Sequence, residues 1–503
     1  MLPASNLDGV NVDPRRGNDE SDAPTATVMS PVHDAHGKLP NWMAIPLFSA
    51  VLLVPCFWQS RIQATDLSSH IYNAWLASQI HRGAAPGLWI APQSNNVLFD
   101  LLLEWLLVHA GANAAQRIAV SASVLVFGWG AILFIFRAAR KNWWIAAPCV
   151  AMLSYGFIFH IGFFNFYLSM GLCLWYLAIF WENSWRIRAA TLPLLIVAWL
   201  AHPFPVVWAV GISAYIALAN RFQPRRRYLV FILGLAVLIG ARYILIHRYK
   251  HAWSWEQVYV ATGANQINVF GTKYLLPYTC LLFIWLLLFR RLAKTHGIAA
   301  IFMTIPAQLW LLNAAAILLL PDAVMFPQFA LPFGFIVQRL SLGAAVMLCA
   351  VLVSAPSGNF EKLALVSVAI LFFALLFSDH RELNQLEDHI DAAISQLPPG
   401  QRVINTPSSN FLRSFSFHHD LDRGCIGRCY SYANYEPSTL QFRIRAQPGN
   451  GIVMDNYADV AAVEAGSYVV RAADLPVYLL YECGVRKVCV SSLHAGDTTG
   501  KRH

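Results

Sequence analysis

Charged side chains are scarce in this sequence, and their scarcity excludes an ordinary soluble protein. Only 13% of the 503 residues are Asp, Glu, Lys or Arg, and 57% are apolar, whereas a soluble domain carries charge on about a quarter of its residues. The apolar residues come in runs rather than at helical or strand period, and the mean hydropathy is +0.49. These features predict an α-helical polytopic membrane protein.

Signatures of nucleotide chemistry and of repeated architecture are also missing. The sequence contains no Gly-rich phosphate loop, no dinucleotide fingerprint and no internal repeat. A net charge of +9 could point to nucleic acid, but the basic residues lie in short segments between apolar runs, as membrane topology requires. The expected partner is therefore the lipid bilayer, and no nucleic acid is expected.

The apolar runs divide the chain into a tail, a membrane domain and a polar C-terminal domain. Residues 1–41 have no apolar period and are expected to form a disordered cytoplasmic tail. Residues 42–378 should form the membrane domain with about 11 to 13 transmembrane helices, beginning with an uncleaved signal-anchor helix at 42–58. Further spans are predicted at 98–111, 117–136, 144–160, 163–181, 189–203, 204–220, 228–246, 272–289, 297–320, 338–355 and 361–378.

Basic residues set the predicted orientation, because Lys and Arg accumulate in cytoplasmic loops. Clusters expected in the cytoplasm begin at Arg137, Arg186, Arg221 and Arg290. The first loop, 59–97, and residues 379–503 then lie on the outer side. In this arrangement 98–111 and 117–136 cannot both cross the bilayer. The segment 98–111 is short and carries two acids, which favours a re-entrant or interfacial helix, with outward-facing Arg137 as the alternative.

Residues 379–503 are predicted to fold as a small extracytoplasmic α/β domain. Its expected elements are a helix near 380–396, strands at 402–405 and 468–471, a helix at 474–483 and a strand at 486–491. The domain holds four of the nine cysteines in two close pairs, which suits an oxidising compartment. The disulfide candidates are Cys425, Cys429, Cys483 and Cys489. Free thiols are the alternative, and the spacing is a weak match to a zinc site.

The first loop carries the most informative polar residues. Residues 66–82 predict an amphipathic helix at the membrane surface, with Asp66, His70 and Asn73 on one face at i, i+4 and i+7. A carboxylate directly after a span is costly unless it faces water or a polar cavity. Asp66 and His70 could simply cap a helix, or they could form a reactive site.

The layout of the chain resembles the GT-C superfamily of membrane glycosyltransferases. The likeness consists of a signal-anchor helix, an Asp soon after it in the first outer loop, a surface helix, many further spans and an outer C-terminal domain. In that superfamily a loop acid acts as general base on the acceptor hydroxyl or binds a metal, and the donor is usually a polyprenyl-phosphate-linked sugar. Asp66 is the matching residue here.

The resemblance implies a transferase of a bacterial inner membrane that acts on a glycan, lipid or protein outside, in the periplasm or beyond the cell. Many members carry two acids close together, whereas this loop has one Asp followed by Ser-Ser-His. A metal-free site with His70 orienting Asp66 or contacting phosphate is therefore favoured over one that uses Mg²⁺ or Mn²⁺.

Other polar residues on the predicted outer side could complete such a site. Arg242 and Arg339 lie near the outer ends of apolar spans, where they could bind a lipid phosphate or simply reach ordinary lipid headgroups. Amides and imidazoles suit sugar hydroxyls, although turns also need such residues. The candidate sugar-binding residues are Gln93, Asn95, Asn96, His160, Asn165 and His202.

Two other functions fit the same layout. A transporter or flippase of a lipid-linked or anionic solute would usually show repeats and polar sites near mid-membrane, which this sequence lacks. A non-enzymatic assembly protein would be expected to expose more apolar surface on its outer domain. The transferase hypothesis uses the clustered outer residues best.

Overall fold

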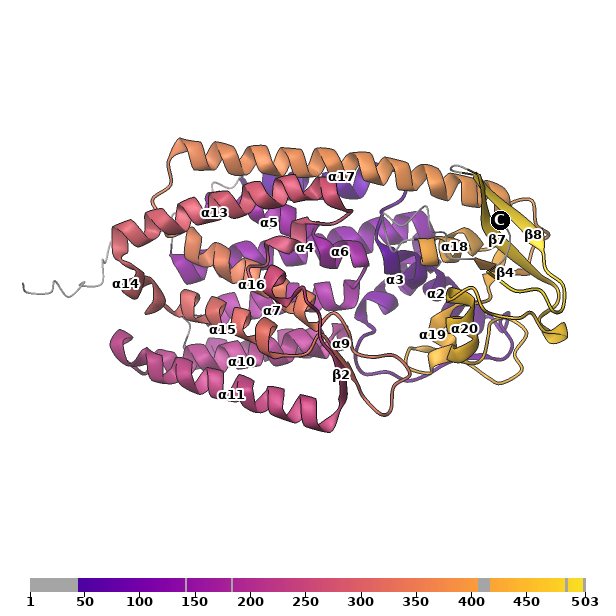
Figure 1. Cartoon of the computed structure of the whole chain (residues 1–503), viewed down its shortest axis with the longest axis horizontal. Coiled ribbons are helices and arrows are strands. Elements are labelled where there is room, and N and C mark those ends of the chain that lie inside the picture. Colours follow the sequence, from indigo (N-terminus) through magenta and orange to yellow (C-terminus); the bar gives the residue numbers. More distant parts are fainter. Residues whose placement is uncertain (1–43, 141–142, 182–183, 406–416, 485–486, 501–503) are drawn as a thin grey trace, which may run out of the picture. The chain divides into compact units, whose positions relative to one another are not determined.

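The computed structural model describes residues 44–140, 143–181, 184–405, 417–484 and 487–500 (Figure 1). Most of these residues are helical, and a small α/β region follows the last long helix. The predicted tail, 1–41, lies outside the described residues. The described part begins with α1 (Ala44–Phe57), which corresponds to the predicted signal-anchor helix.

Every predicted span contains a helix. These helices are α1, α3 (Leu98–Ala110), α4 (Ala112–Ala139), α5 (Ala147–Ser154), α6 (Phe157–Ile161), α7 (Phe164–Phe180), α9 (Leu192–Ala201), α10 (Pro203–Ala219), α11 (Arg227–Arg248), α13 (Leu275–His296), α14 (Ile298–Phe302), α15 (Ile305–Leu319), α16 (Ile336–Leu352) and α17 (Asn359–Ile394).

Four segments within this set are long and apolar enough to cross a membrane: Ala112–Ala139, Pro224–Arg248, Thr272–His296 and Asn359–Ile394. Shorter apolar helices surround them, among them α7, α10, α15 and α16. Several helices can thus span a bilayer. The total of about 11 to 13 spans stays a prediction.

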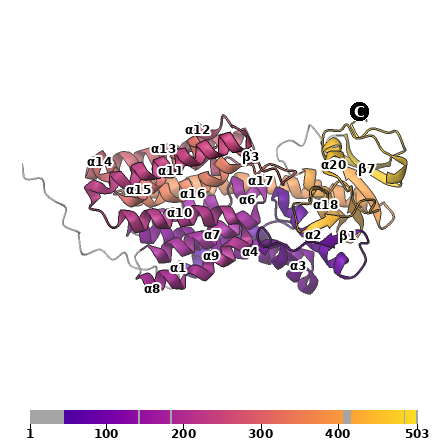
Figure 2. The same cartoon turned by 90° about the horizontal axis from the view of Figure 1, so that it is seen from below.

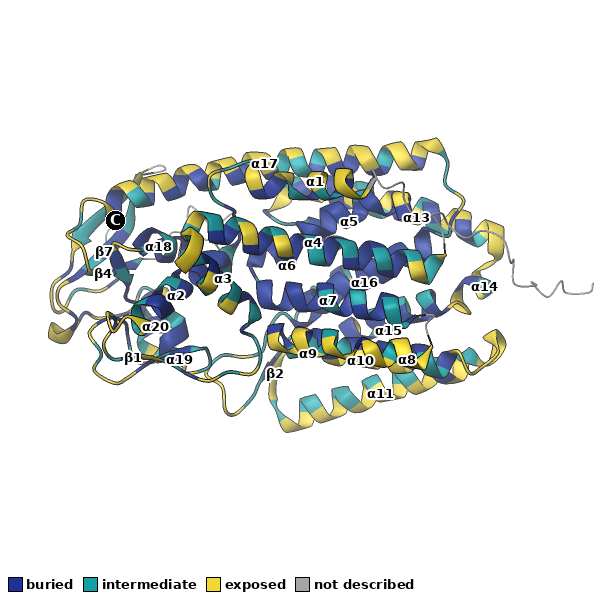
Figure 3. Cartoon of the chain, turned by 180° about the vertical axis from the view of Figure 1, so that it is seen from behind, coloured by how far each residue is buried: buried dark blue, intermediate teal, exposed yellow. Residues whose placement is uncertain are grey.

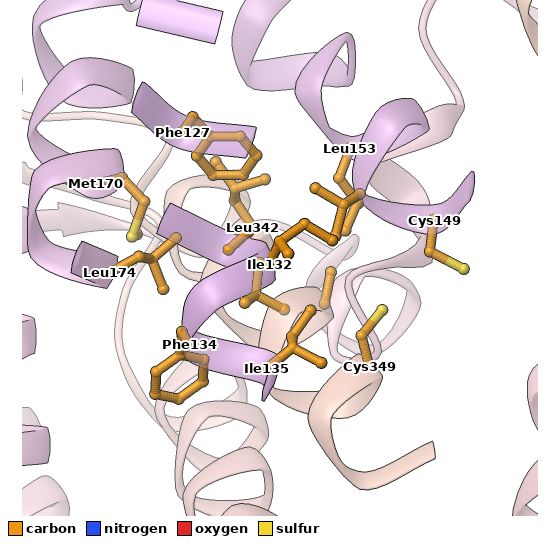
Figure 4. Close-up of a cluster of buried hydrophobic side chains, with 14 of the residues drawn as sticks. Phe127, Ile132, Phe134, Ile135, Cys149, Leu153, Met170, Leu174, Leu342 and Cys349 are labelled. Carbon is orange, nitrogen blue, oxygen red and sulfur yellow. The ribbon is translucent and has the colours of Figure 1, made fainter. Parts of the chain in front are cut away.

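The helical core depends on close approach of α4 and α7. A β-carbon at Gly130 would lie 2.6 Å from the carbonyl oxygen of Gly171, and one at Gly171 would lie 2.8 Å from the Cα of Phe127. Small residues allow such backbone contact between membrane helices. Figure 4 shows the apolar side chains around this contact, which come from α4, α5, α7 and α16.

The outermost helices expose apolar side chains, as lipid-facing helices do. On α11, only Val230 is buried, and Ile232, Val237 and Tyr243 are each more than half exposed. Figure 3 shows the same pattern of exposure along α11. Soluble monomeric proteins rarely expose a continuous apolar surface of this size. The exposed apolar face of α11 therefore supports contact with lipid.

The last long helix runs through the predicted domain boundary. With 36 residues, α17 is about 54 Å long at about 1.5 Å per residue, whereas the hydrocarbon core of a bilayer is about 30 Å thick. Its second half, which includes Asp379 and Glu387, therefore extends beyond the apolar helices. The helical stretch predicted near 380–396 is confirmed to Ile394, and it continues the predicted span at 361–378 in one uninterrupted helix (Figure 1).

A four-stranded sheet forms the C-terminal region, in the order β5-β4-β7-β8. Parallel pairs join β4 (Gln401–Asn405) to β5 (Cys429–Ser431) and to β7 (Val477–Gly484), and β8 (Lys487–Ser492) is antiparallel to β7. The strands predicted at 402–405 and 486–491 are confirmed.

Two predictions for this region were wrong. The segment 474–483 is mainly strand β7 and not a helix, because a short apolar run fits a buried strand as well as a helix. Residues 468–471 form only an isolated bridge, between Val469 and Thr498. The region also holds α18 (Phe417–Cys425), α19 (Tyr435–Thr439) and α20 (Tyr457–Glu464).

Disulfide bonds close two short segments of the C-terminal region. Cys425 at the end of α18 bonds to Cys429 at the start of β5, and Cys483 bonds to Cys489 across the β7–β8 hairpin. The structure thus pairs the four disulfide candidates within each close pair. The other five cysteines are free.

The helix after α1 is buried in protein and does not lie on a lipid surface. In α2 (Thr65–His81), Leu67 and Ile71 pack into the core of the apolar helices. Tyr72 and Leu76 pack with residues of α17, α18 and the sheet. The first loop is also held by pairing of β1 (Leu88–Ile90) with β6 (Ile444–Ala446). Figure 2 shows α2 beside α18, next to the C-terminal region.

One prediction tests the packing of α17 on the C-terminal region. Replacing Ile390, which is 1% exposed in this core, with Ala should lower stability by about 2–5 kcal/mol. The same change at Ile370, 66% exposed on the same helix, should cost less than about 1 kcal/mol. Unfolding of the full chain in nanodiscs, followed by heat or denaturant, measures both. Equal losses would contradict the packing described here.

Candidate functional site

Asp66 lies where the apolar helices meet the C-terminal region. It occupies the first turn of α2, where free backbone N–H groups favour a negative charge. The turn between α6 and α7 packs directly on it, since a β-carbon at Gly162 would lie 2.5 Å from the Asp66 backbone nitrogen. Gly162 also has φ +89, so two constraints require glycine there. The Asp66 side chain stays 21% exposed.

Two cationic side chains approach this carboxylate from other parts of the chain. Nε2 of His419 on α18 lies 3.5 Å from Oδ1 of Asp66, and Arg339 on α16 is close enough to stabilise the charged form. Burial nevertheless raises the pKa of Asp66 above its usual value, and His419, His70 and Arg339 offset only part of that rise. The carboxylate is therefore a stronger base than an exposed Asp.

Arg339 is held in an aromatic cage. Its guanidinium lies 4.1 Å from the centre of the Phe163 ring and 5.1 Å from those of Phe166 and Phe333. Nη1 lies 3.2 Å from Nε2 of His202, whose Nδ1 accepts from the backbone N–H of Phe204. The buried Nε of Arg339 has no hydrogen-bond partner among the described residues. This N–H group is thus enclosed by protein without a hydrogen-bond partner among the described residues.

His70 pairs with a different acid from the one expected. Its Nδ1 lies 2.5 Å from Oδ1 of Asp100 on α3, whereas the histidine with an ion-pair contact to Asp66 is His419. Burial lowers the pKa of His70, but the charge of Asp100 and its hydrogen bond outweigh burial and raise it to about 9. His70 is therefore an imidazolium at neutral pH, bound to a carboxylate.

Asn165 fixes the position of Asp100. Its Nδ2 donates to Oδ2 of Asp100 at 2.9 Å and to the carbonyl of Asn96 at 3.4 Å, and its Oδ1 accepts from the backbone N–H of Phe99 at 2.8 Å. The α3 segment was favoured as re-entrant or interfacial, and whether it crosses the bilayer stays untested. Its acids face protein, whereas Leu101 and Trp105 are exposed.

The position of His419 depends on contacts of α18. Arg423 on this helix donates to both carboxylate oxygens of Glu387, at 3.0 and 3.1 Å, and to the carbonyl of Ile62 at 3.0 Å. Burial lowers the pKa of His419, but its hydrogen bond to Asp422 and the charge of Asp422 raise it to about 9. A second imidazolium therefore accompanies Asp66 at neutral pH.

A small pocket opens beside this cluster, on the side of Asp100. It is lined by residues of α2, α3 and α19 and by residues directly before α3 and β6. Among them are Asn73, Asn96, Asp100, Glu436, Phe442 and Arg443. Burial raises the pKa of Glu436, Asp100 raises it further, and the value reaches about 8. Glu436 is thus largely protonated at neutral pH. Asp66 itself is not part of the lining.

The remaining residues predicted for the site make contacts of several kinds, and one of them, Arg242, lies apart from the Asp66 cluster. Nε2 of Gln93 donates to the carbonyl of Gln441 at 2.8 Å, which ties the first loop to the C-terminal region. Asn95 is half-buried near the end of that loop. Nε2 of His160 lies 3.0 Å from Nε2 of His380 on α17. Arg242 belongs to another site, because it donates to the Leu319 carbonyl and lies over Trp253.

Sequence reasoning missed the acids and the histidine that the C-terminal region contributes. His419, Asp422 and Glu436 are separated from Asp66 by more than 350 residues, so spacing along the chain gave no signal for them. A cluster of ionisable residues between 419 and 423 was the available indication. The described residues hold no group of three or more His, Cys, Asp or Glu arranged to bind a metal.

Comparison with known proteins adds no relative. No family model matches the chain, and neither a curated protein nor a solved structure matches it. The resemblance to GT-C enzymes therefore stays a prediction from the layout and from Asp66.

The pairing of His70 with Asp100 predicts a pH-dependent contribution to stability. The pKa of His70 rises from 6.5 to about 9 on folding, so its contribution is fully present below pH 6.5 and disappears as pH rises through 9. Unfolding of the wild type and of His70→Gln should differ by about 2–3 kcal/mol at pH 6 and much less at pH 10. The exposed His251 provides a control, because His251→Gln should give no such trend. A pH-independent difference for His70→Gln would refute the pairing.

Proposed function

We propose that this protein is a membrane glycosyltransferase of the GT-C type. It would transfer a sugar from a polyprenyl-phosphate donor to an acceptor on the outer side of a bacterial inner membrane. The observation that carries the proposal is the partly buried carboxylate of Asp66 beside Arg339, at the end of a set of apolar helices. A base and a phosphate-binding cation next to a lipid-accessible region are what this reaction needs.

Asp66 acts as the general base. It accepts the proton of the acceptor hydroxyl while the hydroxyl oxygen forms a bond to the anomeric carbon of the donor. A base works best when its pKa approaches the working pH, and burial raises the pKa of Asp66 in that direction. His419, 3.5 Å away, orients the carboxylate and limits that rise.

Arg339 binds the leaving group. As the new bond forms, the bond between the anomeric carbon and the phosphate oxygen breaks, and its electron pair stays on the phosphate. Guanidinium groups bind phosphate oxygens strongly, and the buried Nε of Arg339 has no partner within the described residues. The surrounding aromatic rings keep water away and strengthen the charge interaction.

The proposed step needs no metal. His70 and Asp100 already neutralise each other, and Asp66 is balanced by His419 and Arg339. Bound Mg²⁺ or Mn²⁺ would compete with these protein cations. The proposed step therefore uses only the protein's own cations.

Replacing Asp66 with Asn should lower transfer by about 10²- to 10⁴-fold, because Asn has the same shape but cannot accept the proton. The test is mass-spectrometric profiling of lipid-linked sugars and surface glycans in a deletion strain that carries each variant. Glu382→Gln, at an exposed acid of α17, serves as the control. A wild-type glycan profile with folded Asp66→Asn protein would rule out the base assignment.

Replacing Arg339 with Gln should reduce transfer by about 10²- to 10³-fold, and Arg339→Lys should retain part of the activity because it keeps the charge without the planar fork. Arg381→Gln, at an exposed position of α17, is the control. Turnover and product analysis in membranes from the same strains measure the effect. Unchanged turnover in Arg339→Gln would exclude phosphate binding by this residue.

A further inference from the structure

Helix α11 carries basic residues at both of its ends. Residues 225–227 at its start are three arginines, and Arg242, Arg248 and Lys250 lie in or just after its last two turns. With 22 residues, α11 is about 33 Å long, close to the thickness of about 30 Å of a bilayer core. The two clusters therefore belong to opposite membrane surfaces. The positive-inside rule explains only the cytoplasmic cluster, so the other one needs a different explanation.

The cations of the second cluster, at the predicted outer end of α11, are not neutralised by the protein. None of the three forms an ion pair with a described residue, and Arg248 and Lys250 are exposed. Nη1 of Arg242 donates to the Leu319 carbonyl at 2.9 Å, and its guanidinium lies 4.6 Å from the centre of the Trp253 ring. These two contacts hold the side chain in place and leave its charge uncompensated.

Two acids occur in the segments beside this cluster, but they bind elsewhere. Oε2 of Glu256 accepts from Nε2 of Gln338 at 3.3 Å. Oδ1 of Asp322 accepts from the backbone N–H of Val337 at 3.4 Å. Both acids are thus bound to the start of α16, and the surface at the end of α11 keeps a net positive charge.

Aromatic side chains surround these cations. Trp253 and Trp255 follow strand β2 (Lys250–Ala252) and are exposed, Trp255 to 85%. Strand β2 pairs with β3 (Ala323–Met325), and the exposed Phe329 lies shortly after β3. Figure 1 shows β2 directly beyond the end of α11. Trp and Tyr accumulate where a membrane meets water, so this end of α11 has the composition of a membrane interface.

The exposed apolar face of α11 leads directly to the cations. Val237, Tyr243 and Ile244 are each more than half exposed, and Figure 3 shows exposed residues along the whole helix. A nucleic acid or an acidic protein would neutralise the cations but leave this apolar face uncovered. A phospholipid covers both, because its acyl chains contact the apolar residues while its phosphate meets cations at the interface.

We propose that the surface formed by Arg242, Arg248, Lys250, Trp253 and Trp255 binds anionic phospholipids, of which phosphatidylglycerol is the simplest. The guanidinium and ammonium groups bind the phosphate oxygens, and the acyl chains lie along α11. A zwitterionic lipid carries the same phosphate, but its own ammonium group is repelled by the three cations. The surface therefore selects headgroups with a net negative charge. This inference does not depend on the proposed transferase function.

The lipid composition next to this surface tests the proposal. The full-length protein is reconstituted in phosphatidylcholine nanodiscs with a fluorophore on Val258→Cys, at a side chain that is 77% exposed, and with Cys280→Ser to remove a half-buried thiol. Nitroxide-labelled phosphatidylglycerol and phosphatidylcholine serve as quenchers at equal, low fractions. Phosphatidylglycerol should be enriched about fivefold or more, because each Lys or Arg near a membrane surface contributes about fivefold in affinity for anionic lipid.

Arg248→Gln/Lys250→Gln should bring the two lipids to nearly equal quenching, and because both side chains are exposed the fold should be retained. The matched control, Arg82→Gln/Lys487→Gln, removes the same charge at exposed positions in the first loop and in β8 and should keep the enrichment. Salt at about 1 M should abolish it, since the Debye length is then about 3 Å.

Three results would overturn the assignment. They are equal quenching by both lipids in the wild type, enrichment that survives Arg248→Gln/Lys250→Gln, and an equal loss of enrichment in the control variant. Addition of glycerol phosphate, the free headgroup, should leave the enrichment unchanged. Displacement of phosphatidylglycerol by this soluble phosphate would show that the surface does not require a lipid, and it would also overturn the proposal.

Discussion

The burial of α2 between the apolar helices and the C-terminal region is the constraint on which the site depends. A charge that leaves water must find a partner or give up its charge. His70 pairs with Asp100, and Asp66 is approached by His419. Glu436 meets the same requirement by remaining largely protonated, since burial and Asp100 raise its pKa to about 8. The polar cluster is thus a consequence of packing a polar helix face inside protein.

A rigid connection between the two regions makes this packing possible. Helix α17 continues from the apolar helices into the C-terminal region without a break. Arg61, directly after α1, binds Asp388 and Asp391 on α17, and Arg423 links the same helix to α18. The segments around Asp66 are therefore anchored to one continuous helix. The roles proposed for Asp66 and Arg339 require such support, because small displacements of a catalytic group cost much catalytic power.

The segments that sequence reasoning assigned to the outer side do come together. The α6–α7 turn contacts Asp66 through Gly162, and Arg339 reaches His202 at the start of α10. Gln441 accepts from the backbone N–H of Leu331 with its Oε1, and its own carbonyl accepts from Gln93. Loops from distant parts of the sequence thus share one polar region. Arg242 is the exception, because its contacts lie on α15 and at Trp253.

The sequence by itself determined the helical class and the positions of most helices, because long apolar runs leave few alternatives. The identity of the partners was decided by tertiary structure. Nothing in the spacing of His70 and Asp66 on one helix face indicated that Asp100 would take His70, or that His419 would approach Asp66 from 353 residues away. Strand β7 was predicted as a helix for a related reason. A short apolar run fits either a helix or a buried strand, and only its pairing with β4 and β8 identifies it as a strand. Local pattern fixes which residues are buried, whereas long-range packing decides what each buried charge meets.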